Sequence, residues 1–242
     1  MQRFILTVIT FLAKGILRRH RPIIVGITGS VGKSSSKEAV ALVLSKNFSV
    51  RASIGNLNNE WGVPLTVVGV ASPGRSLLGW IKVLTRAFMQ LVPSVEYPQV
   101  LVLELGVDHP GDMDHLLSMT GTPSIGVLTH VSGSHLEFFG TVAAIGKEKG
   151  KLLAALGEEG TAIINADSET ALKEIGRTKA KVLTYGFTKE AVVRAEHLRI
   201  IQENGQVEGV SFKLNYNGKS IPVRLPGILG SHQVNSILSA VA

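Results

Sequence analysis

Six consecutive residues, Gly-Ser-Val-Gly-Lys-Ser (29–34), combine the residue types that bind phosphate. Glycines let the backbone curl so that successive N–H groups point at one anion, and a helix that starts here adds its positive end. Lys33 can neutralise charge on nucleotide phosphates, and the Ser34 hydroxyl can bind Mg²⁺. The strict P-loop pattern has a glycine six residues before the lysine, where this chain has Ile27. The predicted nucleotide contacts are Thr28, Gly29, Ser30, Val31, Gly32, Lys33, Ser34 and Ser35.

A carboxylate and an imidazole farther along the chain could complete a metal site. Glu104 follows the apolar run at residues 100–103, and the carboxyl ends of strands in an open α/β sheet flank the phosphate crevice. A carboxylate there can bind a hard cation, although an ordinary acid at a strand end has the same pattern. His135 by itself is more simply a structural or surface histidine. Three polar residues of the loop after Glu104 are expected to be solvated: Asp108, His109 and Asp112.

The phosphate loop stands between a predicted strand and a predicted helix. Residues 23–27 form a short β-branched apolar run, and residues 37–46 place apolar side chains at helical spacing. Strand, glycine loop and helix open a βαβ unit. Later segments continue the alternation, with strands at 100–105, 124–128 and 161–165 and a helix at 143–156. The pattern predicts an α/β fold with a doubly wound, mostly parallel sheet.

The character of the chain changes at about residue 181. Short strands follow one another with turn residues such as Asn217-Gly218 between them, which is typical of antiparallel hairpins. We expect a small antiparallel β subdomain at about 181–225, with strands at 181–185, 198–202, 209–216 and 220–225. Residues 232–242 are predicted to form an apolar helix.

The composition limits the classes of function. The chain has 242 residues, 45% hydrophobic and 18% charged, which is typical of a globular protein. It has no cysteine, so disulfides and thiolate metal sites are excluded, and we expect a cytoplasmic protein. The net charge of +7 favours anionic partners, but the basic residues are scattered and only three Tyr and two Trp are present to stack on bases. We therefore expect no nucleic-acid partner.

Residues 1–21 form a separate N-terminal segment, predicted to be an apolar helix with a basic end. Its apolar run, residues 4–13, spans roughly 15 Å as a helix, half of a hydrocarbon core of about 30 Å. It lacks the small-residue cleavage site of a secretory signal. Packing against the domain is one interpretation, and peripheral membrane contact through the apolar face and basic end is the other.

Together with the phosphate loop, four more segments resemble the Mur ligase family, in particular its MurF-like members. The family's loop reads Thr-Gly-x-x-Gly-Lys followed by Ser or Thr, as residues 28–34 do. The other matches are Gly-Asn-Leu-Asn-Asn-Glu-Trp-Gly-Val-Pro-Leu-Thr (55–66), Glu-Leu-Gly (104–106), His-Leu-Glu-x-Phe-Gly (135–140) and Lys-Glu-Lys-Gly (147–150). Their order and spacing identify residues 22–242 as similar to the family's central ATP-binding domain.

The resemblance implies a role for each matching residue. Glu104 and His135 take the family's magnesium-binding positions, beside Ser34. Lys149 matches the lysine that is carbamylated in many members, with Lys147 and Lys151 as competing candidates. A carbamate needs a neutral amine, yet a lysine with a pKa near 10.4 is only about 0.04% neutral at pH 7, so a metal or burial must favour the reaction.

Two further segments border the nucleotide by resemblance. The first is the loop that contains Asn56, Asn58 and Asn59, which flanks the phosphate and substrate pocket by resemblance. Asn59 is the contact we select from it, although asparagines are also common turn residues. Residues 230–234 resemble the family segment near the adenine, where Gln233 replaces an asparagine. A Gln amide can still pair with a purine edge.

The activity that the resemblance implies is that of an ATP-dependent amide ligase in peptidoglycan precursor synthesis, with Lys33, His135 and Lys149 as catalytic residues. ATP would phosphorylate a carboxylate acceptor such as a UDP-muramoyl peptide, and the amine of an amino acid or dipeptide would attack the acyl phosphate. Two alternatives stay open. One is another ligase of the superfamily, of folylpolyglutamate, poly-γ-glutamate or cyanophycin type, and the other is a nucleotide-binding module without catalysis.

The resemblance leaves the family's N-terminal and C-terminal domains unmatched. Only about 21 residues precede the first predicted strand, and the sequence stops inside a helical pattern. We therefore expect residues 1–242 alone to bind ATP weakly and not to turn over ligase substrates.

Overall fold

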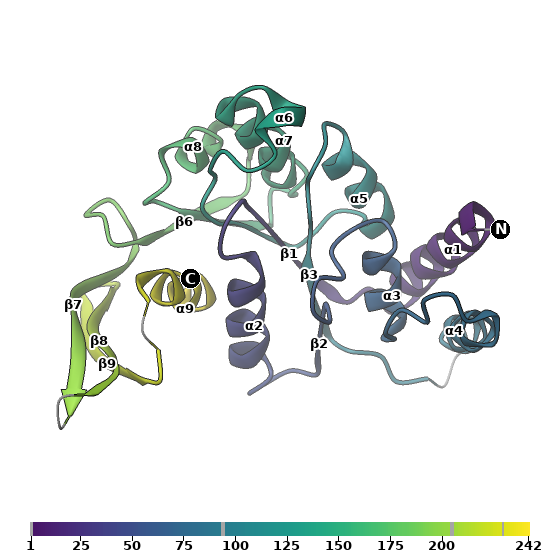
Figure 1. The fold of residues 1–242 in the computed structure, drawn as a ribbon, viewed down its shortest axis with the longest axis horizontal. Coiled ribbons are helices and arrows are strands. Elements are labelled where there is room, and N and C mark those ends of the chain that lie inside the picture. The colour runs from purple at the N-terminus through teal and green to yellow at the C-terminus, as the bar shows by residue number, and fades with distance from the viewer. Residues whose placement is uncertain (1, 93–94, 204–205, 229) are drawn as a thin grey trace.

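The computed structural model describes residues 2–92, 95–203, 206–228 and 230–242, and in it the chain builds one mixed sheet covered by helices (Figure 1). Within these residues the sheet has nine strands in the order β2-β3-β1-β4-β5-β6-β7-β8-β9. The strands from β2 to β6 in this order, β1 included, are parallel to one another, and β7, β8 and β9 form an antiparallel extension. The strands are β1 (Ile23–Thr28), β2 (Val50–Ala52), β3 (Val100–Glu104), β4 (Ile125–Leu128), β5 (Thr161–Asn165), β6 (Lys181–Gly186), β7 (Val193–Glu203), β8 (Gln206–Tyr216) and β9 (Lys219–Pro226).

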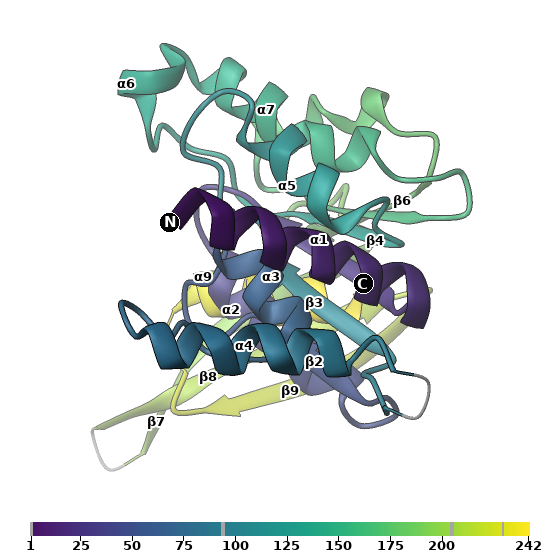
Figure 2. The same cartoon turned by 90° about the vertical axis from the view of Figure 1, so that its right-hand side faces the viewer.

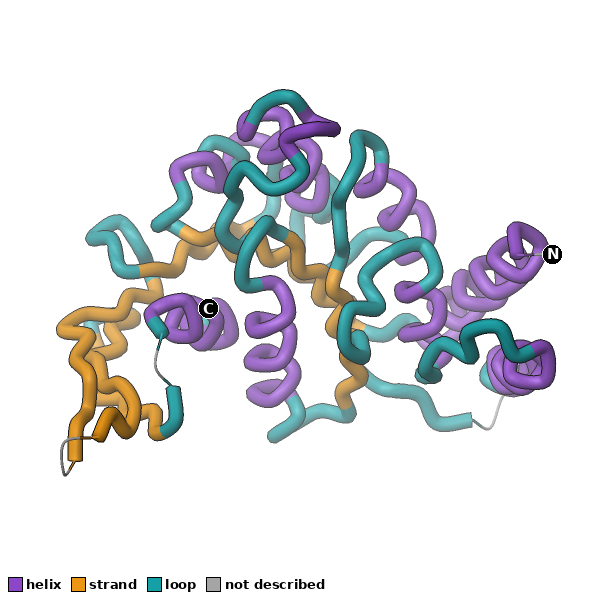
Figure 3. Tube along the Cα trace, viewed as in Figure 1, coloured by secondary structure: helices purple, strands orange, loops and turns teal. Residues whose placement is uncertain are grey.

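Helices cover both faces of the parallel part, as the tube in Figure 3 shows. Helices α2 and α9 pack on one face, and α1, α3, α4, α5 and α7 pack on the other. The helices are α1 (Gln2–His20), α2 (Lys33–Leu44), α3 (Gly62–Val68), α4 (Leu77–Met89), α5 (Asp112–Thr120), α6 (Leu136–Phe139), α7 (Val142–Ala154), α8 (Glu169–Leu172), a 3-10 turn (Ile175–Arg177) and α9 (Ser231–Val241).

Alternating side chains of the central strands divide the core into two layers. In β3, Val100 and Val102 face the cluster beneath α2 and α9, whereas Leu101 and Leu103 face the cluster beneath α1, α3 and α5. Successive residues of a strand point to opposite faces, so a strand buried on both faces is apolar throughout. The continuous apolar run that predicted this strand therefore has a direct structural cause.

The predicted α/β class and doubly wound sheet are confirmed, with differences in detail. Helix α2 begins at Lys33, four residues before the predicted start, because its first turn is the polar part of the phosphate loop. Strand β6 pairs parallel with β5, and the antiparallel pairing begins only at β7–β8, so the expected boundary at residue 181 was placed one strand too early. A short β-rich run does not reveal the direction of its neighbour. Helices α3, α4 and α5 and strand β2 were not predicted.

Helix α1 packs against the domain through one side. Its buried residues recur at helical spacing and join the core shared with α3, α4 and α5, so one side of the helix packs against the domain. These buried residues are Ile5, Ile9, Ala13, Ile16 and Leu17. Among the described residues, none of the helices has the length and apolar character needed to cross a membrane.

Candidate nucleotide-binding site

The phosphate loop connects the end of β1 to the first turn of α2, and its backbone conformation requires glycine. Gly29 has φ of 149° and Gly32 has φ of 88°, both in the region that favours glycine. A Cβ at Gly29 would lie 1.9 Å from Oγ1 of Thr129. That hydroxyl donates a hydrogen bond of 2.8 Å to the carbonyl of Val31 and so fixes the loop against the end of β4. The loop leaves the N-terminal N–H groups of α2 free for an anion.

Glu104 meets the loop because β1 and β3 pair in parallel, with Ile27 opposite Glu104. The Glu104 side chain is only 2% exposed. Its Oε2 accepts a hydrogen bond of 2.9 Å from the Ser34 hydroxyl, and its Oε1 accepts one of 3.0 Å from Nδ2 of Asn58. The Lys37 ammonium lies 3.5 Å from Oε2 and is equally buried. The structure therefore brings two of the three predicted metal ligands, Ser34 and Glu104, into contact, whereas the third, His135, lies beside Asp108.

These oxygen atoms fit the chemistry of magnesium. Mg²⁺ is usually held by one or two carboxylates together with substrate phosphates and water, and a P-loop hydroxyl is a common further ligand. Ser34 and Glu104 supply a hydroxyl and a carboxylate at the positive end of α2, where nucleotide phosphates would lie.

Lys149 on α7 is buried, with only 1% of the residue exposed, and is therefore not a solvated charge on the helix surface. Its Nζ donates a hydrogen bond of 3.1 Å to the carbonyl of Val107. Burial, and to a smaller extent the positive charge of Lys33, lowers the pKa of Lys149 to about 8. The carboxylates of Asp108, Asp112 and Glu148 oppose this shift only in part. About a tenth of the amine is neutral at pH 7 with such a pKa.

The two competing lysines lie in different surroundings. Lys147 is exposed on α7. The Nζ of Lys151 lies 2.6 Å from a carboxylate oxygen of Asp114 and 2.6 Å from one of Glu148. Both interactions favour the protonated amine and raise the pKa of Lys151. Of these three lysines on α7, Lys149 has the surroundings that favour a neutral amine.

His135 lies next to Asp108, which is four residues beyond Glu104. The His135 Nε2 is 3.2 Å from Oδ1 of Asp108, with side chains 40% and 61% exposed. His135 has φ of 62° and directly precedes α6, whose Phe138 ring packs on the His109 ring with centroids 4.1 Å apart. Asp108 is exposed, as expected, but it also pairs with the predicted histidine. Its charge acts on Lys149, which links His135 to the rest of the site.

Asn59 uses its side chain to start α3. Its Oδ1 accepts hydrogen bonds of 2.9 Å from the N–H of Gly62 and 3.2 Å from that of Trp61. Asn59 also lines a cavity of about 410 Å³ with Asn58, Gly106 and Asp108. The residue of this loop that reaches Glu104 is Asn58.

The residues in and next to the segment predicted to lie near the adenine line two different hollows. A hollow of about 190 Å³ beside Val31 and Gly32 is lined by His232 and Asn235, among others. Asn235 donates from Nδ2 to an Asp167 carboxylate oxygen at 3.2 Å, while its Oδ1 is buried without a hydrogen-bond partner among the described residues. Gln233 lines a different hollow between α2 and α9, together with Ser35 and Leu42.

Sequence reasoning missed Asn58, Lys37 and Asn235 as site residues. Lys37 lies one turn after Lys33 on the same side of α2, which is a signal in the sequence. Asn235 stands two residues after Gln233 and directly follows the segment selected from the sequence. The position of Asn58 depends on the path of its loop, and the sequence pattern does not determine that path.

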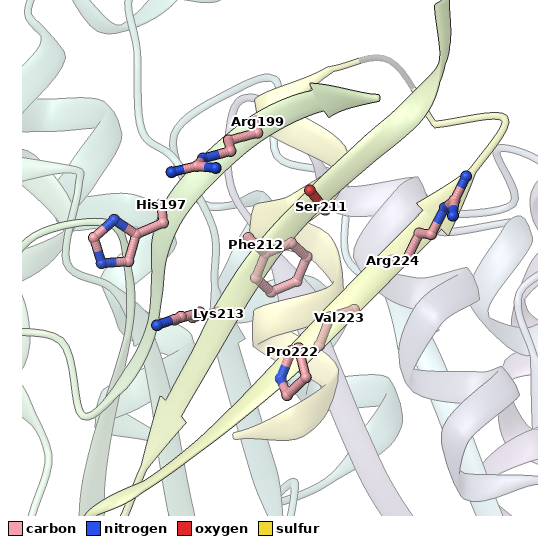
Figure 4. A pocket seen from close by; sticks show the side chains of 8 residues that line it. All are labelled: His197, Arg199, Ser211, Phe212, Lys213, Pro222, Val223 and Arg224. Carbon is pink, nitrogen blue, oxygen red and sulfur yellow. The ribbon is translucent and has the colours of Figure 1, made fainter. Parts of the chain in front are cut away.

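A larger hollow, of about 520 Å³, lies over the antiparallel extension and holds none of the predicted site residues. Figure 4 shows Arg199, Lys213 and Arg224 on three adjacent strands of this extension. Ser211 pairs with Arg199 on one side and with Arg224 on the other, so Arg199, Ser211 and Arg224 form one row across the sheet.

Comparison with known proteins gives the same picture of the domain. The family model described as Mur ligase middle domain matches residues 84–242. A UDP-N-acetylmuramoyl-tripeptide–D-alanyl-D-alanine ligase from Escherichia coli (strain K12) is 30% identical over 227 residues, which cover 90% of this chain and 42% of that protein. A UDP-N-acetylmuramoyl-L-alanyl-D-glutamate–2,6-diaminopimelate ligase from Chlamydia caviae is 30% identical over 219 residues, with 90% and 42% covered. The chain thus spans less than half the length of these relatives.

A solved structure shares the fold. The MurF ligase from Thermotoga maritima, determined in complex with ADP, superposes with a TM-score of 0.78 at 24% identity. The match covers 98% of this chain and 48% of that one. It extends over β1 and the phosphate loop, which lie outside the residues matched by the family model.

Proposed function

This chain belongs to the Mur ligase family, whose middle domain it contains, and on that premise we propose that it is the ATP-binding core of a ligase that joins a carboxylate to an amine. The observation that carries the proposal is the contact between Ser34 at the start of α2 and Glu104 at the end of β3. Phosphate binding alone does not require a buried carboxylate at this point. A magnesium-assisted phosphoryl transfer does.

Each residue of the site has a task in this reaction. The loop N–H groups and Lys33 bind the β- and γ-phosphates and orient the γ-phosphate toward the acceptor. Ser34 and Glu104 would hold magnesium, with His135 as the further ligand implied by the family. The bound ion would neutralise negative charge on the transferring phosphoryl group.

The chemistry proceeds in two steps with ATP as the only phosphoryl donor. An oxygen of the acceptor carboxylate attacks the γ-phosphorus of ATP, ADP leaves, and an acyl phosphate forms. The amine then attacks the acyl carbon, loses a proton and expels inorganic phosphate, which leaves an amide. The chain's contribution is to hold the charged groups in line and away from water.

Lys149 fits the role of the carbamylated lysine. Carbamylation joins a neutral amine to CO₂, and the low pKa of the buried Lys149 makes the neutral amine far more abundant than in a solvated lysine. The product carries a negative charge. Placed near Lys33, it would support a second magnesium ion at the γ-phosphate.

The proposal for the substrates rests on the names of two similar relatives. We propose a UDP-muramoyl peptide as the carboxylate acceptor and a dipeptide or amino acid as the amine, in a cytoplasmic step of peptidoglycan precursor synthesis. The cavity of about 410 Å³ beside Asn59 and Asp108 is also lined by Asn58, which donates a hydrogen bond to Glu104, and it is the place we assign to the acceptor carboxylate.

Two measurements test the proposal. Titration calorimetry with magnesium and ATP should show that Lys33→Ala weakens binding about 100-fold, as expected when a charge-assisted phosphate contact is lost. Lys46→Ala, in the exposed turn that follows the same helix, should bind like the unaltered chain. Equal binding by both variants would exclude the loop as the phosphate site.

Turnover separates a ligase from a binding module. In the protein at the length its gene encodes, phosphate release with acceptor and amine should be lost in Lys149→Ala, while ATP affinity should stay within a few-fold. Retention of phosphate release in this variant would contradict the catalytic role of Lys149. Absence of turnover in the unaltered protein with any Mur-type substrate would favour the binding module.

A further inference from the structure

Helix α4 has an apolar side that no described part of the chain covers. Val83 and Ala87 are buried, whereas five other apolar side chains of the helix are between 52% and 72% exposed. These are Leu77, Leu78, Ile81, Phe88 and Met89. At 100° per residue they fall within one arc of the helix surface. Large exposed apolar patches of this kind mark interaction sites.

Helix α1 extends this patch. The two helices lie side by side at one end of the molecule, in front in Figure 2, and the ring of His20 at the end of α1 lies 2.8 Å from the carbonyl of Gln90 beyond α4. Phe4 and Phe11 of α1 are 72% and 73% exposed and, seven residues apart, share one side of the helix. We call these two and the five α4 residues the α1–α4 surface.

Charge is concentrated at the same place. Residues 1–21 and 61–95 together contain eight of the 25 basic residues and none of the 18 acidic ones. The rest of the chain therefore has 17 basic against 18 acidic residues, a formal charge of −1. The net positive charge of this protein thus lies in the two segments that contain α1 and α4. The basic residues are Arg3, Lys14, Arg18, Arg19, Arg21, Arg75, Lys82 and Arg86.

We propose that the α1–α4 surface docks on an anionic lipid membrane. Exposed Leu, Ile, Phe and Met side chains would enter the boundary between headgroups and acyl chains, and the surrounding cations would bind lipid phosphates. A second copy of the chain fits this surface poorly, because the two segments that contain α1 and α4 have eight basic and no acidic residues and would repel the same segments of the copy. The proposal does not depend on the ligase activity and can fail or succeed without it.

Tryptophan fluorescence can report docking of this surface. Trp80 lies on α4, and its ring centroid is 5.5 Å from that of Trp61, the other tryptophan of the sequence. We expect vesicles of phosphatidylcholine with phosphatidylglycerol to shift the tryptophan emission to shorter wavelength and to sediment the protein. Vesicles of phosphatidylcholine alone should do neither, and added salt should weaken binding because it screens the cations.

Matched variants locate the surface. The double variant Leu78→Ser with Phe88→Ser should bind anionic vesicles roughly 100-fold more weakly, at about tenfold for each large apolar side chain removed. The control is Ile200→Ser with Ile221→Ser, two residues of β7 and β9 that are 63% and 53% exposed at the opposite end of the sheet (Figure 1). This control should bind like the unaltered protein.

A second pair of variants tests the charge. Lys82→Gln with Arg86→Gln should weaken vesicle binding roughly 30-fold, about fivefold for each cation near the lipid surface. Lys179→Gln with Lys189→Gln removes the same charge from exposed positions elsewhere and should leave binding unchanged. Circular dichroism of each variant checks that the fold is retained.

Three results would overturn the proposal. The first is sedimentation by neither vesicle type, and the second is an equal loss in the α4 variants and their controls. The third is a dimer in size-exclusion chromatography that Leu78→Ser with Phe88→Ser converts to a monomer, because the surface would then be an interface between copies.

Discussion

The hydroxyl of Ser34 lies 2.9 Å from Oε2 of Glu104, and this contact joins the first turn of α2 to the carboxyl end of β3. It exists because β1 and β3 pair in parallel and end at the same edge of the sheet. Lys37, one turn along α2, lies 3.5 Å from the same oxygen, so a buried cation and a buried anion face each other at the phosphate loop. The contact has consequences for both stability and binding.

Replacing Glu104 by Gln should affect both properties at once. The amide is nearly the size of the carboxylate but leaves the buried Lys37 ammonium without a counter-charge, so the unfolding free energy should fall by about 3 kcal/mol. The affinity for magnesium with ATP should fall at least about tenfold, since amide oxygens are weaker ligands for Mg²⁺. Urea unfolding and titration calorimetry measure the two effects. Glu38→Gln, on the exposed side of α2, is the control and should change neither.

The central strands and the phosphate loop could be predicted from the sequence because their signals are local. Strand β3 is apolar throughout since it is buried on both faces, and the glycines of the loop are required by its backbone angles. Helix α4 could also have been found, because Ser76 caps it by accepting from the Gly79 N–H at 3.1 Å. The direction of β6 could not, since pairing direction depends on neighbours distant in sequence.

Because of Lys149, the unfolding free energy should rise as the pH increases above about 8. Its pKa falls from 10.5 in the unfolded chain to about 8 in the folded one, mainly by burial. Below pH 8 both states are protonated and the folded state carries the cost of a buried ammonium. Between pH 8 and 10.5 the unfolded state binds more protons, so stability rises with pH, by up to roughly 3 kcal/mol.

Urea unfolding at about pH 7.5 and about pH 9.5 measures this contribution as a difference between variants. Lys149→Met removes the titrating amine. The unfolding free energy of the unaltered chain should therefore rise relative to that of this variant as the pH increases. Lys147→Met, on the exposed side of the same helix, should leave the profile of the unaltered chain intact. An identical pH profile for all three proteins would contradict the lowered pKa.

Gly29→Ala should disturb the phosphate loop more than its size suggests. The new Cβ would lie 1.9 Å from Oγ1 of Thr129 and 3.2 Å from the carbonyl of His130, at φ of 149°. Relief of this contact breaks the hydrogen bond from Thr129 to Val31, so we expect a loss of about 2 kcal/mol in unfolding free energy and at least about tenfold in ATP affinity. Gly157→Ala, where a Cβ has no neighbour within 4 Å, should change stability by less than about 0.5 kcal/mol.

The parts of the site that the sequence did not reveal depend on loop packing. Asn58 reaches Glu104 because Asn59 caps α3 and turns the loop over the end of β3. The turn also needs Gly62, where a Cβ would lie 2.3 Å from the backbone of Leu57. Such close backbone approaches are set by tertiary contacts, and residue types alone did not show that Asn58, and not the selected Asn59, contacts Glu104.

The adenine side offers the sharpest comparison, because neighbouring residues of α9 face different hollows. Asn235 has a buried Oδ1 without a partner among the described residues and lines the hollow beside Val31 and Gly32. An adenine amino group could donate to that oxygen. The Oε1 of Gln233, the residue predicted to contact the base, is likewise buried without a partner among the described residues, but Gln233 lines the hollow between α2 and α9.

Asn235→Ala should therefore weaken ATP binding about tenfold, the cost of one hydrogen bond in a desolvated site, and leave binding of inorganic tripolyphosphate unchanged. Gln233→Ala should leave both affinities unchanged. Tripolyphosphate is the internal control, because it occupies the loop at Lys33 without a base and so reports damage to the phosphate site. The opposite result is that Gln233→Ala lowers the affinity for ATP but not for tripolyphosphate, while Asn235→Ala lowers neither. The base would then lie in the hollow between α2 and α9, as predicted from the sequence, and not in the hollow beside Val31 and Gly32.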